Sequence, residues 1–597
     1  MQFLARWLIG FGRPERLVAF CCIALLLGPT ANWAAEPTEV EARPPTLLGI
    51  ERLTLTGRVQ PHGMPTTWHF EYGPTKQYGQ QTASEPLPPR LAAYYHETWD
   101  QGWNGWRTWD PRQRHFAEGG ASAGYIRYQA IDRDDHNHDD GIGTVHLAKY
   151  MYPGPVTPIP SAFLAAGDPD FRDARVKVAV RGVDWQPHGT ELMWWSQSQS
   201  NIEINPDDGT LHPNYLHANW CFTGANLTGL LRSGEWEQAD YRLTNDPHAW
   251  SYCGNNPRRQ DYQYWPLNNM QRHLNLDFFH MVVFVDPNDR PKGAIDFDEF
   301  EVAYRNYSLV VPFNGGKLLA APPDSPDDAV VLTDGWRNGP GRMWSSGQNP
   351  SAPQDFVYEF AQPVMVNSVQ LHQHTAWPSR EVEVLVSTDG KDWRPLVSGV
   401  LPEKHAEGPN YAFLLQRKLN AAARQVKVRI LSGYRPEHWG LGEIEIFGSG
   451  AEMQTDDDWY HVNCDSVPLQ PGETYHFRLV TESAAGRATG PDQTFTMPSD
   501  ARPHVIIGQT SRIGQDTAKV EGRINPLGHQ TMFHFEYGTD ESCSQKTEQR
   551  YGGRQLTPRS AFDTLTGLKP DTLYYVRLAA SNEVGTATSD VATFRTK

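Results

Sequence analysis

The sequence is poor in cysteine and has no long apolar run after its first thirty residues. It holds 6 cysteines in 597 residues, which excludes a small disulfide-stapled scaffold. The apolar stretch 17–27 is too short for a membrane-spanning helix, which needs about 20 residues. Because arginines precede this stretch and Ala31, Ala34 and Ala35 follow it, segment 1–35 is predicted to be an export signal.

The chain also lacks a basic stripe. Its net charge is −17 at pH 7, and the acidic residues are spread along the sequence. A polyanion binder normally concentrates lysine and arginine on one surface, so the charge argues against nucleic acid and membrane lipid as partners. With 39% hydrophobic and 21% charged residues the chain is typical of globular proteins, and its length predicts several domains.

Helical periodicity of useful length is missing as well. Apolar residues instead alternate with polar ones, as in the stretches 175–181, 382–386 and 426–430. A period of two is typical of strands with one buried face. The sequence therefore predicts an all-β, multidomain protein built from β-sandwiches.

Known catalytic signatures are few. The sequence has no His-Glu-x-x-His, paired Cys-x-x-Cys or phosphate-loop pattern. Gly120, Ser122 and Gly124 have the spacing of a nucleophile elbow, but that motif needs a following helix, and 125–128 has a strand pattern. Glu97 with Asp298 or Glu299 offers carboxylates for glycoside hydrolysis. An active site in 88–312 is therefore an alternative and not the leading prediction.

An internal repeat organises the chain. Segments 57–61 and 68–73 recur at 522–526 and 533–538, 465 positions later, whereas segment 469–479 recurs at 568–578, only 99 positions later. The first copy must therefore be interrupted. Its halves are predicted at 46–86 and 454–499, with whole domains inserted between them, and the uninterrupted copy at 502–597.

The repeat resembles the fibronectin type III domains of bacterial secreted proteins. The resemblance rests on the Phe-Glu-Tyr-Gly strand end and on the Leu-x-Pro-x-Thr-x-Tyr pattern, in which Tyr475 and Tyr574 match the family's corner tyrosine. It implies two β-sandwiches that act mainly as spacers.

The second insert, 313–448, resembles the discoidin or coagulation-factor type C family, which has a galactose-binding-like jelly-roll fold. The matching segments are 332–335, 344–345, 356–360, 384–393 and 442–448. The resemblance implies that loops on one face hold a sugar with a histidine, an arginine and an aromatic ring. The candidate ligand-binding residues are His374, Trp377, Tyr434, Arg435, His438 and Trp439. It also implies a structural calcium ion held by Asp334 and Glu443. The alternative is that Asp334 only caps the turn at Gly335 and that Glu443 is solvated, because an Asp-Gly pair is also an ordinary turn signal.

The first insert, 88–312, resembles jelly-roll carbohydrate-binding modules in its aromatic opening segment 97–106 and its acidic closing segment 295–302. In such a jelly roll Glu97 and Asp298 would hold a structural calcium ion. Cys221 and Cys253 lie in one tryptophan-rich region and are predicted to form a disulfide, since the chain is expected to be exported. Pairing of Cys464 and Cys543 is left open.

Taken together, these patterns predict a non-catalytic carbohydrate-binding or adhesion protein that is secreted or attached to the cell surface. The expected partner is a polysaccharide or glycan, and the expected cofactor is structural calcium. Two alternatives remain: a polysaccharide-degrading enzyme with its active site in 88–312, and a purely structural surface protein.

Overall fold

The computed structural model describes residues 36–597 except 101, 103–112, 130–135, 138–142, 147–169, 187–190, 201–215, 223, 225–226, 253–266, 273–276, 286–291, 337–341, 404–412 and 554–557. The predicted export signal at 1–35 and Cys253 lie outside the described residues, as does the side chain of Cys221, so the predicted disulfide is not described. Cys464 and Cys543 are not bonded to each other. None of the helices in the described residues is long and apolar enough to cross a membrane.

The all-β prediction is confirmed: the described residues form seven sheets of antiparallel strands. The alternation of apolar and polar residues along the strands explains why the sheets pack in layers. In segment 175–181, for example, Val176, Val178 and Val180 are fully buried, while Arg175 is exposed. Each sheet buries one such apolar face, which is why the sheets pack against one another.

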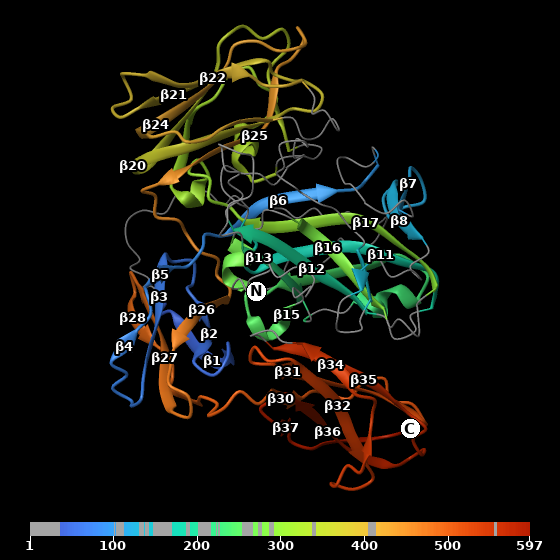
Figure 1. The fold of residues 1–597 in the computed structure, drawn as a ribbon. Coiled ribbons are helices and arrows are strands. Elements are labelled where there is room, and N and C mark those ends of the chain that lie inside the picture. Colours follow the sequence, from blue (N-terminus) through green and yellow to red (C-terminus); the bar gives the residue numbers. More distant parts are fainter. Residues whose placement is uncertain are drawn as a thin grey trace, which may run out of the picture. The chain divides into compact units, whose positions relative to one another are not determined.

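The interrupted repeat forms what we call the split sandwich, with strands from both halves in the same sheets (Figure 1). One sheet has the order β1-β2-β26. In the other sheet β27 pairs with the whole length of β3. Leu53, Phe70, Val462 and Leu479 share one core. The strands are β1 (Glu39–Leu47), β2 (Arg52–Gln60), β3 (Thr66–Gly73), β4 (Gln80–Gln81), β5 (Glu85–Pro86), β26 (Tyr460–Pro468), β27 (Thr474–Ser483), β28 (Gly486–Thr489) and β29 (Gln493–Thr496).

The uninterrupted repeat forms the C-terminal sandwich, with sheets β30-β31-β35 and β33-β32-β36-β37. Contacts of the first copy recur in it. Tyr475 Oη accepts the backbone N–H of Gln470 at 3.0 Å, and Tyr574 Oη accepts that of Lys569 at 3.0 Å. The strands are β30 (His504–Ile507), β31 (Thr517–Asn525), β32 (Thr531–Gly538), β33 (Gln545–Lys546), β34 (Arg550–Gly553), β35 (Arg559–Thr566), β36 (Leu573–Ser581), β37 (Thr586–Thr588) and β38 (Ala592–Arg595).

The first insert consists of two sheets (Figure 1). They share one aromatic-rich core. The orders are β14-β11-β17-β8-β7, with β6 also paired to β17, and β15-β13-β12-β16-β10-β9. Its elements are β6 (Leu91–Glu97), β7 (Gln113–Phe116), β8 (Tyr125–Gln129), β9 (His136–Asn137), β10 (Gly143–His146), β11 (Ala174–Gln186), β12 (Glu191–Ser200), β13 (Leu216–Phe222), η1 (Leu227–Arg232), β14 (Glu237–Leu243), η2 (Pro247–Ala249), β15 (Trp250–Tyr252), α1 (Leu267–Arg272), β16 (Asp277–Val285) and β17 (Lys292–Arg305).

The second insert is built on a sheet of order β19-β25-β20-β24-β21-β22, with β18 and β23 paired to β20. The long strand β20 pairs with β24 in its first part and with β25 in its second, so it turns the sheet around the core. Its elements are η3 (Pro312–Asn314), β18 (Gly316–Ala320), η4 (Ala329–Thr333), β19 (Trp344–Ser345), β20 (Gln354–Gln373), β21 (Glu381–Ser387), β22 (Arg394–Val400), β23 (Phe413–Gln416), β24 (Ala421–Ile430) and β25 (Gly440–Ser449).

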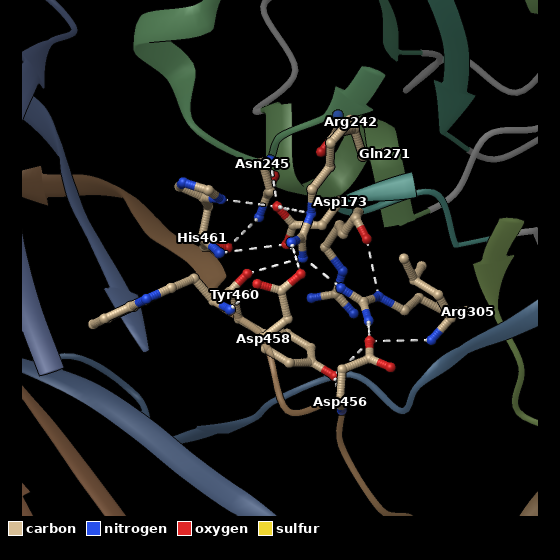
Figure 2. A network of polar contacts seen from close by, with 12 residues as sticks. Asp173, Arg242, Asn245, Gln271, Arg305, Asp456, Asp458, Tyr460 and His461 are labelled. Carbon is tan, nitrogen blue, oxygen red and sulfur yellow. Dashed lines mark hydrogen bonds and ion pairs between the residues drawn. The ribbon is translucent and has the colours of Figure 1, made fainter. Parts of the chain in front are cut away.

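A network of charged residues joins the first insert to the split sandwich (Figure 2). Arg305, at the end of β17, is buried with 0% side-chain exposure, and its Nη1 donates to Asp456 Oδ2 at 2.7 Å. Its Nη2 lies 3.5 Å from Asp173 Oδ2. Asp173 also pairs with Arg242, at 3.7 Å, and with His461, whose Nδ1 lies 2.9 Å from Oδ1. The network therefore links residues of both regions through buried ion pairs.

Electrostatics in this network favour the charged state of Asp173. Burial alone would raise the pKa of Asp173, but the positive charge of Arg242, the hydrogen bond with His461 and the positive charge of Arg305 hold it well below its usual range. Burial likewise opposes the charge on Arg305, and the neighbouring Tyr460, Asp173 and Asp456 still raise its pKa. Both groups are thus ionised at neutral pH, and each depends on the other for compensation.

Candidate functional site

The two loops predicted to bind a ligand meet at one end of the second insert. One follows β20 and spans 374–379, and the other precedes β25 and spans 431–439. The backbone N–H of Tyr434 donates to the carbonyl of Pro378 at 2.9 Å, and Ser379 and Gly433 form an isolated antiparallel bridge. The six predicted ligand-binding residues therefore lie on adjoining segments, which we call the paired loops.

His374 lies beneath the surface of the paired loops. It is buried, and its Nδ1 accepts the backbone N–H groups of Ala376 at 3.0 Å and Trp377 at 2.9 Å. Burial lowers the pKa of His374 to about 4. The imidazole is therefore neutral at pH 7, as it must be to accept two N–H groups, and it fixes the turn that presents Trp377.

Trp377 and His438 form a ring pair at the surface. Their centroids lie 4.7 Å apart, with 54° between the planes, and both residues are half-buried. Nδ1 of His438 is 2.9 Å from the carbonyl oxygen of Ser346, so this nitrogen carries the donated proton. The same serine accepts the backbone N–H of Trp439 through its Oγ at 3.0 Å. Ser346 thus orients His438 and Trp439. The sequence patterns do not indicate this serine, although it directly follows the Trp344-Ser345 pattern.

The other three residues frame this pair. Tyr434 Oη donates to the carbonyl of Leu401 at 3.1 Å, and Trp439 Nε1 donates to that of Arg435 at 3.1 Å. The Trp439 ring leaves no space above Gly433, where a Cβ atom would lie 2.1 Å from its Cδ1. Arg435 is exposed and pairs with Glu403 at 3.3 Å. Tyr434 and Trp439 therefore shape the paired loops, whereas Arg435 faces solvent.

The predicted calcium ligands of the second insert converge on one turn. Glu443 is 1% exposed, and its Oε1 accepts the backbone N–H of Gly335 at 3.0 Å, so the alternative that Glu443 is solvated is wrong. Asp334 accepts the N–H of Trp336 at 2.8 Å and lies 3.2 Å from Arg342. Burial raises the pKa of Asp334. Two carboxylates at one turn provide the hard oxygen donors that suit calcium.

The predicted pair of the first insert lies on neighbouring strands, β6 and β17. Glu97 accepts the Tyr95 hydroxyl at 2.9 Å and the Trp99 backbone N–H at 2.8 Å. Asp298 accepts the backbone N–H groups of Ser122 at 2.9 Å and Glu299 at 2.7 Å, while burial raises its pKa to about 6. Ser122 is followed by the strand β8 and not by a helix, as the strand pattern of 125–128 predicts. In the described part of the chain, no three or more His, Cys, Asp or Glu side chains are grouped as a metal site.

No family model matches the chain, and no curated protein matches it. Among solved structures, the module CpGH89CBM32-5 from Clostridium perfringens, in complex with GalNAc-β-1,3-galactose, is 19% identical and covers 23% of this chain and 99% of its own, with a TM-score of 0.20. The family 32 CBM from C. perfringens NanJ, in complex with galactose, is 14% identical; the match covers 23% of this chain and 96% of that module, with a TM-score of 0.19. Chitosan-binding module 1 from a chitosanase/glucanase of Paenibacillus sp. IK-5 is 17% identical; the match covers 24% of this chain and 100% of that module, with a TM-score of 0.18.

Proposed function

We propose that this chain is an exported, non-catalytic carbohydrate-binding protein whose paired loops in the second insert hold a saccharide. The observation that carries the proposal is the half-buried ring pair of Trp377 and His438, together with the exposed Arg435 on the same loop as His438. The C–H face of a pyranose stacks on an aromatic ring, and a few directed polar groups select its hydroxyls.

The residues of the paired loops divide into two roles. His374 and Ser346 are engaged with backbone groups and position the surface. Trp377 supplies the stacking ring. Because His438 donates through Nδ1, its Nε2 is left as an acceptor for a sugar hydroxyl, and Arg435 adds guanidinium donors. We assign the two repeats the role of spacers, as their resemblance to fibronectin type III domains implies.

Replacing Trp377 by alanine is expected to weaken saccharide binding about fivefold or more, since a lost aromatic stacking contact is worth about 1 kcal/mol or more. Binding of the full chain is screened on a glycan array, and the affinity of the best ligand is then measured by calorimetry.

A matched control is Trp393→Ala. Trp393 is also half-buried, and it lies beyond β21, at the end of that strand away from the paired loops. Equal losses in both variants, or none in Trp377→Ala, would contradict the assignment of the paired loops. A chain that binds no glycan would favour the purely structural alternative.

We also propose calcium at the turn of Asp334 and Glu443. Calcium is expected to raise the melting temperature of the full chain relative to chelator, because an ion that binds only the folded state stabilises it by mass action. In Glu443→Gln the amide oxygen can still accept the N–H of Gly335, but the negative charge is lost, so the calcium-dependent shift should shrink or vanish. Differential scanning calorimetry with calcium and with chelator measures this, and a wild-type protein that shows no shift refutes the site.

In the first insert we propose a structural role for Glu97 and Asp298, and the structural calcium ion that the resemblance implies for them stays a prediction. Each accepts at least two hydrogen bonds from neighbouring protein groups, which holds its carboxylate in place at the junction of β6 and β17. Release of reducing sugar ends from any polysaccharide the protein binds would favour the enzymatic alternative.

A further inference from the structure

The first insert has a surface of its own that carries arginine and aromatic side chains. Core-facing residues of β8, β11 and β17 include Ile126, Val180 and Ile295. Their strand neighbours face the other way and, with one residue of β7 and one preceding β14, form what we call the arginine–aromatic face. Its members are Phe116, Tyr125, Arg127, Arg181, Trp236 and Asp296.

Guanidinium groups alternate with rings on this face. Phe116 and Tyr125 are stacked, with centroids 4.9 Å apart and planes at 8°, and Trp236 meets Tyr125 edge-on at 5.8 Å. Arg127 lies over Phe116 at 5.1 Å and over Tyr125 at 5.5 Å. Arg181 lies over Tyr125 at 5.3 Å and over Trp236 at 4.4 Å. The rings hold both guanidiniums in fixed orientations.

Both arginines share one carboxylate. Arg127 donates from Nε to Asp296 Oδ1 at 2.6 Å and from Nη2 to Oδ2 at 2.8 Å. Arg181 donates from Nε and Nη2 to Oδ2 at 2.9 and 2.7 Å. Asp296 is 0% exposed, whereas the arginine side chains are 19% and 20% exposed. Two cations therefore face a single anion, and a second anion would balance them.

The remaining donors point to the chemistry of that anion. In each arginine, Nε and Nη2 donate hydrogen bonds to Asp296. Within the described ranges, the Nη1 atom of neither arginine donates to a protein acceptor. A guanidinium edge matches a planar carboxylate through two parallel hydrogen bonds. Since the flanking loops also carry Glu118 and Glu235, recognition would come from these directed donors and not from net charge.

We infer that the arginine–aromatic face binds a polysaccharide of uronic acids. The sugar carboxylate would lie on the Nη1 edges of Arg127 and Arg181, and a sugar ring would stack on the half-buried Phe116 or Trp236. This site is separate from the paired loops, and neither assignment depends on the other.

Calorimetric titration of the full chain with oligogalacturonides tests the inference. The wild-type protein is expected to bind them and to bind neutral galactan oligomers more weakly at this site. Arg181→Lys keeps the charge but loses the planar edge, so it should lower the oligogalacturonide affinity at least tenfold. Trp236→Ala, which leaves both pairs with Asp296 in place, should also lower it.

Two controls separate this site from general charge and from the other insert. Arg175→Lys alters an exposed arginine on the same strand and should bind like wild type, as should Trp377→Ala. Melting temperatures establish that each variant is folded. Failure of the wild type to bind oligogalacturonides, or equal affinities in Arg181→Lys and Arg175→Lys, would overturn the inference and leave the paired loops untouched.

Discussion

Replacing Arg305 by methionine is expected to destabilise the protein by about 3–5 kcal/mol, the usual cost of removing one partner from a buried ion pair. Arg305 is fully buried between Asp173 and Asp456, so its loss leaves two carboxylates short of positive charge. The loss should appear in urea unfolding of the full chain as an earlier transition of the first insert and the split sandwich.

Arg175→Met provides a matched control for this prediction. Arg175 pairs with Asp458 at 3.5 Å, but its side chain is 61% exposed, and exposed ion pairs contribute about 0–1 kcal/mol. If Arg305→Met unfolds at the same urea concentration as Arg175→Met, the buried network does not stabilise the contact between the first insert and the split sandwich.

The second large effect is expected at a pair of equivalent glycines, Gly57 and Gly522. A Cβ on Gly57 would lie 2.7 Å from Leu479 Cδ2 and 2.8 Å from the Glu41 carbonyl oxygen. On Gly522 it would lie 2.7 Å from Leu578 Cδ2 and 2.7 Å from the Ile506 carbonyl oxygen. Because the carbonyl contacts involve paired strands, alanine at either position should cost about 1–3 kcal/mol through overpacking.

Each alanine should lower the stability of its own sandwich alone, which thermal unfolding of the two variants can resolve. Gly229→Ala is the control, since Gly229 has open space around its Cβ position. If Gly57→Ala is as stable as Gly229→Ala, the close approach of the strands is not a constraint on this fold.

The alternation of apolar and polar residues within short segments was sufficient to predict the strands. The alternation in 175–181 and 426–430 predicted β11 and β24, since a strand with one buried face records its orientation in its own sequence. The positions of His374 and Trp377 after β20 and of Arg435 and Trp439 before β25 were predicted from the family resemblance, which implies the order of strands and loops.

Long-range polar contacts could not be predicted in this way. Asp173 and His461 are 288 positions apart, and nothing in the residues around either one indicates the other. Arg127 and Arg181 meet at Asp296 only because β8 and β11 both pair with β17. Such sites depend on which strands become neighbours, which is a property of the topology and not of any single segment.

The chain leaves the split sandwich and returns to it at almost one point. The backbone N–H of Arg90 donates to the carbonyl of Gln454 at 3.2 Å, and that of Asn306 donates to the carbonyl of Arg90 at 3.2 Å. During synthesis β2 and β3 emerge long before their partners β26 and β27, and an unfolded insert would make their pairing the closure of a very long loop. Once the inserts have folded, their ends are already adjacent and that entropic cost is gone. The split sandwich should therefore be the last of these regions to fold, with β2 and β3 left as unprotected edges until then.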